Sequence, residues 1–378
     1  SFEMDTIYDG TNSIIVLNMT ENRVKGIIPK EIGAALKDLK ILDLGQNMLT
    51  GTIPSTLGDA TDLSTLYLGD NALTGTIPSS LGKLTKCTHL YVDRNNLQGP
   101  LPNELSNLSE ITMLGLHQNT LTGAIPDLSA MKKLRALYLD SNELSGELPT
   151  SIGELSALID LRLGSNEITG TIPTELGNLE SLRDLHIQRN RLSGSLPLSF
   201  AGMKNLREFH AYSNKITGKI PVQIGFLGFF SQLKILYLDG NELTGTIPPS
   251  VANMKDLVDL YLGNNNLEGP IPTTIYRLSS LKNLRLNDNE LTGTIPVEFD
   301  KLSQLEYLYL QNCRLEGAIP NELGVLNKLF RLRLYGNALS GTMPRGVCHL
   351  RGLHLEELQV DCEGVSPAIE CTCCTTCF

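Results

Sequence analysis

The chain has 378 residues, with 31 Lys and Arg against 41 Asp and Glu, which gives a formal net charge of -10. This acidic balance argues against binding to nucleic acid or to an anionic membrane surface, because both attract clustered basic side chains. No apolar run reaches the length needed to cross a bilayer.

The first residues, SFEMDTIYDG, begin with neither a Met nor a signal peptide. We therefore expect the chain to be a processed or trimmed product. Residues 1–13 precede the first repeat, and we expect them to form a partial N-terminal cap.

One sequence unit then recurs fourteen times over residues 14–352, and most copies are 24 residues long. Its pattern is L-x-x-L-x-L-x-x-N-x-L-x-G-x-I-P-x-x-L-G-x-L, and a fixed period of this length predicts stacked repeats that share one continuous core. The units begin at Ile14, Leu39, Leu63, Cys87, Ile111, Leu134, Leu158, Leu182, Leu206, Leu233, Leu257, Leu281, Leu305 and Leu329.

Each fixed position has a physical role. The alternation in L-x-x-L-x-L predicts a short strand with one buried face. Position nine is Asn in thirteen units and Cys313 in the other, and its amide can satisfy backbone groups of the turn. Position thirteen is always Gly, which permits an unusual backbone conformation, and position sixteen is always Pro, which prevents regular pairing of the return segment.

The G-x-I-P half of the unit resembles the plant-type leucine-rich repeat of receptor-kinase ectodomains and polygalacturonase-inhibiting proteins. The resemblance implies an α/β solenoid, a right-handed superhelix with a parallel β-sheet on its concave side and short 3-10 or irregular segments on its convex side. The chain lacks Trp and the N-terminal Cys and Trp cap of plant relatives. We therefore expect residues upstream to be missing.

Specificity is expected in the variable strand positions that face solvent, which are positions three, five and seven. Nine of the eleven tyrosines fall there, and large aromatic and Arg side chains are typical of recognition surfaces. Position five carries Asn18, Asp43, Tyr67, Tyr91, Gly115, Tyr138, Arg162, His186, His210, Tyr237, Tyr261, Arg285, Tyr309 and Arg333. The expected ligand-binding residues are Tyr138, Arg162, Asp184, His186, Glu208, His210, Tyr212, Tyr237, Tyr261, Arg285, Tyr307 and Tyr309. An alternative is that the tyrosines only stack and stabilise the sheet.

Charged pairs occupy positions three and five of three successive units: Asp160 with Arg162, Asp184 with His186, and Glu208 with His210. They form either a solvated charge network or a contact for a cationic or hydroxyl-rich ligand. The two histidines could also make binding depend on pH, or hold a metal ion. An open sheet offers no water-excluding pocket, so we expect no catalysis. We also expect no cofactor and no metal site.

Two further features interrupt or vary the pattern. The 27-residue unit from Leu206 to Gln232 brings Phe226, Phe229 and Phe230 together, as local packing or as a contact for a partner.

The triplet T-G-T occurs five times, and regular rows of Thr side chains order water in ice-binding proteins. Charged and Pro interruptions between these triplets argue against that function.

Eight cysteines divide into two groups. Cys87 and Cys313 fall at core positions and are expected to stay free and buried. Six others crowd near the C-terminus, and we expect three disulfides in a cap over residues 353–378, with fifteen pairings open. They are Cys348, Cys362, Cys371, Cys373, Cys374 and Cys377. A zinc site is the rival reading. This ending also resembles secreted or cell-surface repeat proteins of diatoms and related algae.

Two N-x-S/T sequons, at Asn18 and Asn107, are candidate glycosylation sites. We expect an extracellular or cell-surface, non-enzymatic module that binds a protein, peptide or polysaccharide on its concave face. The alternatives are a structural or adhesive wall protein that self-associates and, more remotely, an ice-binding protein.

Overall fold

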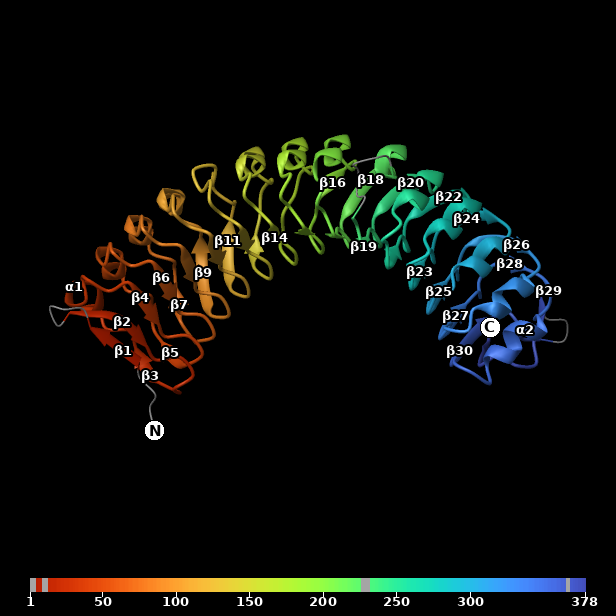
Figure 1. Ribbon diagram of the computed structural model, residues 1–378, viewed down its shortest axis with the longest axis horizontal. Helices are drawn as coiled ribbons and strands as arrows, with labels where there is room; N and C mark the ends of the chain where they lie inside the picture. The colour runs from red at the N-terminus through yellow and green to blue at the C-terminus, as the bar shows by residue number, and fades with distance from the viewer. Residues whose placement is uncertain (1–4, 9–12, 226–231, 365–367) are drawn as a thin grey trace. The chain divides into compact units, whose positions relative to one another are not determined.

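The computed structural model describes residues 5–8, 13–225, 232–364 and 368–378. The chain forms two compact units, residues 1–192 and 193–378. In each unit, short strands form a main sheet along one side of the stacked repeats, and 3-10 helices lie on the other side (Figure 1). Within each unit this is the predicted arrangement of a repeat solenoid.

The main sheet of the first unit is parallel and in register, so that the same repeat positions lie side by side. At its N-terminal edge, β1 (Asp5–Tyr8) pairs antiparallel with β2 (Ile14–Asn18). The remaining strands are β4 (Ile41–Asp43), β6 (Thr65–Tyr67), β8 (His89–Tyr91), β10 (Met113–Gly115), β12 (Ala136–Tyr138), β14 (Asp160–Arg162) and β15 (Asp184–His186).

The second unit repeats this arrangement with parallel pairing throughout its main sheet. Its strands are β17 (Glu208–His210), β19 (Ile235–Tyr237), β21 (Asp259–Tyr261), β23 (Asn283–Arg285), β25 (Tyr307–Tyr309), β27 (Arg331–Arg333), β30 (Glu357–Val360) and β32 (Thr376–Cys377).

After the turn, most repeats add a second short strand, and these strands form smaller parallel ladders. The repeat that begins at Leu158 has an isolated bridge there instead, at Thr169. In the first unit these are β3 (Lys25–Ile27), β5 (Met48–Thr50), β7 (Thr74–Gly75), β9 (Asn96–Pro100), β11 (Thr120–Gly123) and β13 (Glu143–Leu144). In the second unit they are β16 (Ser193–Gly194), β18 (Lys215–Lys219), β20 (Glu242–Gly245), β22 (Asn266–Pro270), β24 (Glu290–Gly293), β26 (Arg314–Gly317), β28 (Ala338–Leu339), β29 (Gly341–Thr342) and β31 (Ile369–Glu370).

Helical turns follow the prolines of position sixteen, which begin them in extended conformation. In the first unit they are α1 (Ile32–Ala35), η1 (Ser55–Asp59), η2 (Ser79–Lys83), η3 (Asn103–Asn107), η4 (Thr150–Glu154) and η5 (Thr174–Asn178). In the second unit they are η6 (Leu198–Gly202), η7 (Val222–Gly225), η8 (Pro249–Asn253), η9 (Thr273–Arg277), η10 (Val297–Lys301), η11 (Asn321–Val325) and α2 (Arg345–Leu350).

The core lies between the main sheet and the 3-10 helices. Each repeat contributes apolar side chains from its strand, its second strand and its helical turn, and none of them is buried without the neighbouring repeats. In the repeat that begins at Leu63, the side chains are at most 2% exposed at Leu63, Leu66, Leu68, Leu73, Ile77, Leu81 and Leu84.

Two backbone positions in every repeat are left-handed. Glycine at position thirteen has φ between 72° and 111° in all fourteen repeats, as its invariance predicts. Position eight, just before the asparagine, is also left-handed in all fourteen, with φ of 49° to 57° in the twelve non-glycine cases. Sequence reasoning missed position eight because its residue types vary.

The asparagines of position nine form a hydrogen-bonded ladder, as predicted. Asn95 donates from Nδ2 to the carbonyls of Leu68 (3.0 Å), Val92 (3.1 Å) and Asp93 (3.0 Å), and its Oδ1 accepts from the Leu73 N–H at 2.9 Å. The amide therefore ties the turn of its own repeat to the preceding repeat.

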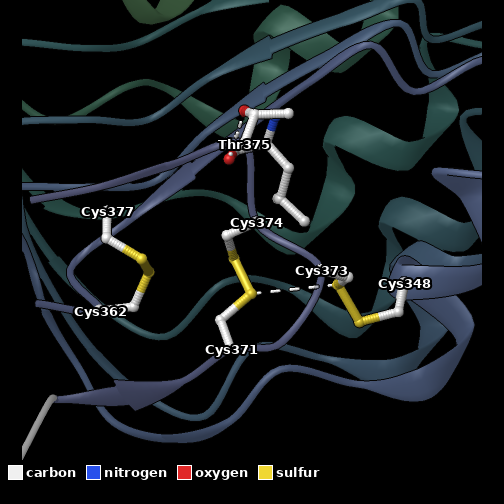
Figure 2. Close-up of a disulfide and its surroundings, with 8 residues drawn as sticks. Cys348, Cys362, Cys371, Cys373, Cys374, Thr375 and Cys377 are labelled. Atoms are coloured by element: carbon white, nitrogen blue, oxygen red, sulfur yellow. Dashed lines mark hydrogen bonds between the residues drawn. A yellow bond between two sulfur atoms is a disulfide. The ribbon is translucent and has the colours of Figure 1, made fainter.

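We call α2 together with β30, β31 and β32 the C-terminal cap, which adds α2 and Cys348 to the expected segment 353–378. The six cysteines form three disulfides, as predicted, and the pairing that the sequence left open is Cys348 with Cys373, Cys362 with Cys377, and Cys371 with Cys374 (Figure 2). Cys87 and Cys313 are free and buried, and burial raises the pKa of their thiols to about 12 and about 11. The six clustered thiols are all paired in these disulfides, which is the arrangement expected of a disulfide cap and not of a zinc site.

Candidate functional site

The candidate site is the sheet face, which we define as the side of the main sheet that carries positions three, five and seven. In the first unit the Tyr67 and Tyr91 rings lie 5.2 Å apart. The Tyr91 ring also covers Gly115, where an added Cβ would lie 2.3 Å from it. The space above Gly115, which has no side chain of its own at position five, is therefore filled by a neighbouring ring.

Arg162 is engaged within its own strand. Its Nε and Nη2 donate to the Asp160 carboxylate at 3.1 and 2.9 Å, and its guanidinium lies 4.9 Å from the Tyr138 ring centre. The Tyr138 hydroxyl donates to the same carboxylate at 3.1 Å. This bonding raises the pKa of Arg162 and leaves Asp160 only 9% exposed. The pairing supports the charge-network reading at this strand.

A row at position seven was not singled out from the sequence. Asp93, His117 and Asp140 follow one another on adjacent repeats, and His117 Nε2 lies 3.5 Å from Asp93 Oδ2. Burial raises the pKa of both carboxyls, while His117 opposes that shift. The alternation of Asp, His and Asp at one repeat position was the available signal.

Hollows in the first unit are open to solvent. One on the sheet face is lined by residues that include Asp43, Tyr67, Asp70, Tyr91 and Asp93. A second on the same face is lined by residues that include His89, Met113, Arg135, Tyr138, Asp160 and Asp184, which places the predicted Asp184 beside Tyr138. A larger apolar hollow, near Ile27, Ile53 and Pro54, lies away from the sheet face. None of these places a nucleophile beside a base in an enclosed cavity.

In the second unit, position five forms a continuous stack that we call the ring ladder: His210, Tyr237, Tyr261, Arg285, Tyr309 and Arg333. The ring centres of His210 and Tyr237 are 4.7 Å apart, and those of Tyr237 and Tyr261 are 4.2 Å apart and nearly parallel. The Arg285 guanidinium lies 4.1 Å from the Tyr261 centre and 5.0 Å from the Tyr309 centre. Arg333 covers the other side of Tyr309 at 4.4 Å.

Tyr309 corrects one expectation. It was predicted to face solvent, but it is only 6% exposed because the guanidinium groups of Arg285 and Arg333 cover both faces of its ring. Tyr307 lies beside it, with ring centres 6.4 Å apart, and packs against Phe330 at 5.8 Å. The predicted stacking of position-five side chains is therefore real throughout this ladder.

The cations of the ladder differ in their partners. Arg333 donates to Glu357, which also lies 3.3 Å from Arg331. Arg285 makes no ion pair with any residue in the described ranges, and its buried Nε has no hydrogen-bond partner. Burial raises the pKa of Asp239, and the nearby charge of Arg285 offsets part of that rise. Arg285 is thus a fixed cation without a carboxylate of its own.

The other predicted residues lie on the same faces. Asp184 and His186 end the first unit's main sheet on β15. In the second unit, His210 Nε2 lies 3.5 Å from the Glu208 carboxylate, and Tyr212 lies 6.3 Å from Tyr237, ring centre to ring centre.

The remaining predicted features lie elsewhere. Asn18 ends β2, and Asn107 is exposed at the end of η3. Phe226, Phe229 and Phe230 lie outside the described residues. No helix in the described part of the chain is both long and apolar enough to span a membrane.

Comparison with known proteins identifies the family of the chain and structures that share its fold. The sequence matches the family described as "Leucine rich repeat" over residues 132–192, 231–291 and 257–315, and as "Leucine Rich Repeat" over 38–60, 62–84 and 86–108. Comparison with curated protein sequences gives no significant match.

Similar solved structures include two plant receptors. The plant peptide hormone receptor RGFR1, in complex with RGF2, is 30% identical with a TM-score of 0.77, and the alignment covers 94% of this chain and 67% of that one. The Arabidopsis receptor kinase HAESA ectodomain, in complex with an N-terminally extended IDA peptide hormone ligand, is 32% identical with a TM-score of 0.79, and the alignment covers 91% of this chain and 61% of that one. The chain thus spans about two thirds of these receptor chains.

Similar structures also occur outside plant receptors. The leucine-rich-repeat protein LIC12759 of Leptospira interrogans is 32% identical over 91% of this chain and 83% of that one, with a TM-score of 0.72. A plant ice-binding protein, 24% identical with a TM-score of 0.53 over 82% of this chain and 85% of that one, shares the fold alone.

Proposed function

This protein is a plant-type member of the leucine-rich repeat family, and we propose that it is an extracellular, non-enzymatic recognition module that binds a peptide or protein segment on its sheet face. The observation that carries the proposal is Arg285, whose guanidinium is held between Tyr261 and Tyr309 without an ion-pair partner among the described residues. A guanidinium that is already ordered loses little entropy when it binds a carboxylate or a similar acidic group.

The ring ladder favours a peptide over a polysaccharide. Sugar rings bind proteins by stacking on open aromatic faces, whereas the faces of Tyr237, Tyr261 and Tyr309 are covered by their neighbours in the ladder. What the ladder offers to a ligand is a row of ring edges and guanidinium groups, together with the Tyr237 hydroxyl, which also donates to Asp259 at 3.0 Å. Such a row suits hydrogen bonds to an extended chain and to its polar side chains.

Support for an extracellular setting comes from the three disulfides of the cap, since disulfides persist in oxidising compartments. RGFR1 and HAESA, with which the chain shares its repeats, bind peptide hormones. Asn107 is exposed on η3, away from the sheet face, so we propose it as a glycan acceptor that leaves binding unaffected. Asn18 is a second candidate, although its Oδ1 accepts the Thr20 N–H at 3.0 Å.

The test begins with two selections on the purified protein: a random peptide library and a glycan array. Selected binders are then measured by calorimetry against wild type, Arg285→Ala and Arg277→Ala. Arg277 lies on η9, away from the sheet face, and serves as the matched control. We expect peptides to be selected, Arg285→Ala to weaken binding by about 10- to 100-fold, and Arg277→Ala to bind like wild type.

Thermal melts show whether each variant is folded, and Arg285→Lys supplies a second reading because it keeps the charge but loses the planar stack. Selection of glycans alone, or full affinity in folded Arg285→Ala, would overturn the proposal. Concentration-dependent assembly without a ligand, measured by sedimentation, would instead favour the self-associating wall protein.

A further inference from the structure

Two disulfides of the C-terminal cap lie side by side. The bond between Cys371 and Cys374 closes a four-residue segment, and the bond between Cys348 and Cys373 links that segment to α2. The Sγ atoms of Cys371 and Cys373 are 3.9 Å apart (Figure 2). One sulfur of each bond is therefore in van der Waals contact with the other bond.

The segment 371–374 is held at both ends by contacts that need no disulfide. Before it, β31 pairs with β29, and the Ile369 side chain is fully buried. After it, the Thr375 N–H and hydroxyl donate to the Leu358 carbonyl at 2.9 and 2.8 Å, and the Leu358 N–H donates back to the hydroxyl at 2.8 Å. Breaking the bond between Cys371 and Cys374 would therefore leave Cys371 beside Cys373.

The cysteine residues of this segment are partly exposed, unlike those that carry the free thiols of the protein. Cys371, Cys373 and Cys374 are partly exposed, and Thr372 between them is exposed. Cys87 and Cys313 are buried, and their raised pKa values keep them protonated at neutral pH. Thiol chemistry with an external reagent is thus confined to the cap.

We propose that the cap is a thiol-reactive site in which a small monothiol attacks the bond between Cys371 and Cys374, and a second exchange releases Cys348. In the first step the external thiolate forms a bond to Cys374 Sγ, and Cys371 leaves as a thiolate. In the second step Cys371 Sγ attacks Cys373 Sγ, the bond between Cys348 and Cys373 breaks, and Cys348 leaves as a thiolate that takes up a proton.

The exchange is balanced without an added oxidant. Two disulfides and one external thiol become two disulfides and one protein thiol, because the new bonds are the mixed disulfide at Cys374 and the bond between Cys371 and Cys373. The bond between Cys362 and Cys377 and the pairing of β32 with β30 are untouched. The consequence is a folded cap with one free thiol, Cys348, on α2.

The chain itself provides a direct readout. Trypsin cleaves after Arg345 and Arg351, so Cys348 falls on the peptide 346–351 and the other five cap cysteines fall on 352–378. The intact protein is treated with glutathione, quenched with acid, alkylated with a maleimide and digested without reduction. We expect free, alkylated 346–351, together with a 352–378 peptide that carries one glutathione at Cys374.

A matched variant separates this route from direct attack. The Cys371→Ser, Cys374→Ser double variant keeps the bond between Cys348 and Cys373 but lacks the proposed point of attack. We expect its release of Cys348 to be at least about tenfold slower than in wild type. Equal rates would overturn the proposal. If the double variant does not fold, wild type still decides: glutathione on Cys373 or Cys348 in place of Cys374, or no release of 346–351, would overturn it.

Discussion

Replacing Cys313 with Asn should stabilise the fold by about 1 to 2 kcal/mol. Cys313 is the one break in the asparagine ladder, and its single S–H is shared between the Leu286 carbonyl at 3.4 Å and the Gln311 carbonyl at 3.8 Å. The asparagine of the preceding repeat, Asn289, donates to three carbonyls at 3.0 to 3.2 Å and accepts the Leu267 N–H at 2.9 Å.

The magnitude follows from this difference. An amide at residue 313 would add about two good hydrogen bonds, each with a net value of roughly 0.5 to 1.5 kcal/mol. Ordering the longer side chain would offset part of that gain, by up to about 1 kcal/mol. The reverse change, Asn289→Cys, should cost a similar amount, and Asn289→Ala should cost about 1 to 3 kcal/mol because it leaves buried backbone groups unpaired.

The assay is urea unfolding followed by circular dichroism and by tyrosine fluorescence. The two probes should give the same transition if a single free energy of unfolding is to be compared. A lower urea midpoint in Cys313→Asn, or an unchanged midpoint in Asn289→Cys, would show that the ladder amide does not stabilise the turn as its hydrogen bonds suggest.

Three other changes test packing, charge and covalent links. Tyr237→Ala should lower the free energy of unfolding by about 2 kcal/mol because the ring contacts with His210, Tyr261 and Tyr212 are lost. Tyr276→Ala on η9 should change it little, and thermal melts compare the two. Asp93→Asn should stabilise the protein at pH 7 but not at pH 3, because burial raises the pKa of the Asp93 carboxyl in the folded state. Ionising that carboxyl at a pH above its ordinary pKa therefore costs stability. Urea unfolding at both pH values measures the difference. Removing the bond between Cys348 and Cys373, with both replaced by Ser, should cost up to about 3.5 kcal/mol for a loop of this length, again measured with urea.

The sequence was most informative where the repeats agree. Glycine at position thirteen and asparagine at position nine are nearly invariant, so one physical reason could be tested against all copies. The pairing of Asp160 with Arg162 was also readable, because residues two apart in a strand share a face.

Other features depend on contacts between repeats that no single repeat encodes. Tyr309 was expected to be exposed, and its burial depends on how far Arg285 and Arg333 extend from neighbouring strands. That Arg285 forms no ion pair with a described residue is likewise a property of its surroundings. The disulfide pairing in the cap depends on where α2 and β30 place the cysteines in space. The spacing of the cysteines in the sequence does not determine those positions.

The left-handed backbone at position eight has a consequence for anyone who wishes to redesign this surface. A β-branched side chain is strongly disfavoured at positive φ, and the fourteen repeats carry Glu, Gln, Asp, Arg, Ser, Asn or Gly there but never Val, Ile or Thr. Combinatorial libraries can therefore vary positions three, five and seven broadly. At position eight they should be restricted to glycine, asparagine and other residues without a branched Cβ, so that every member of the library can form the turn.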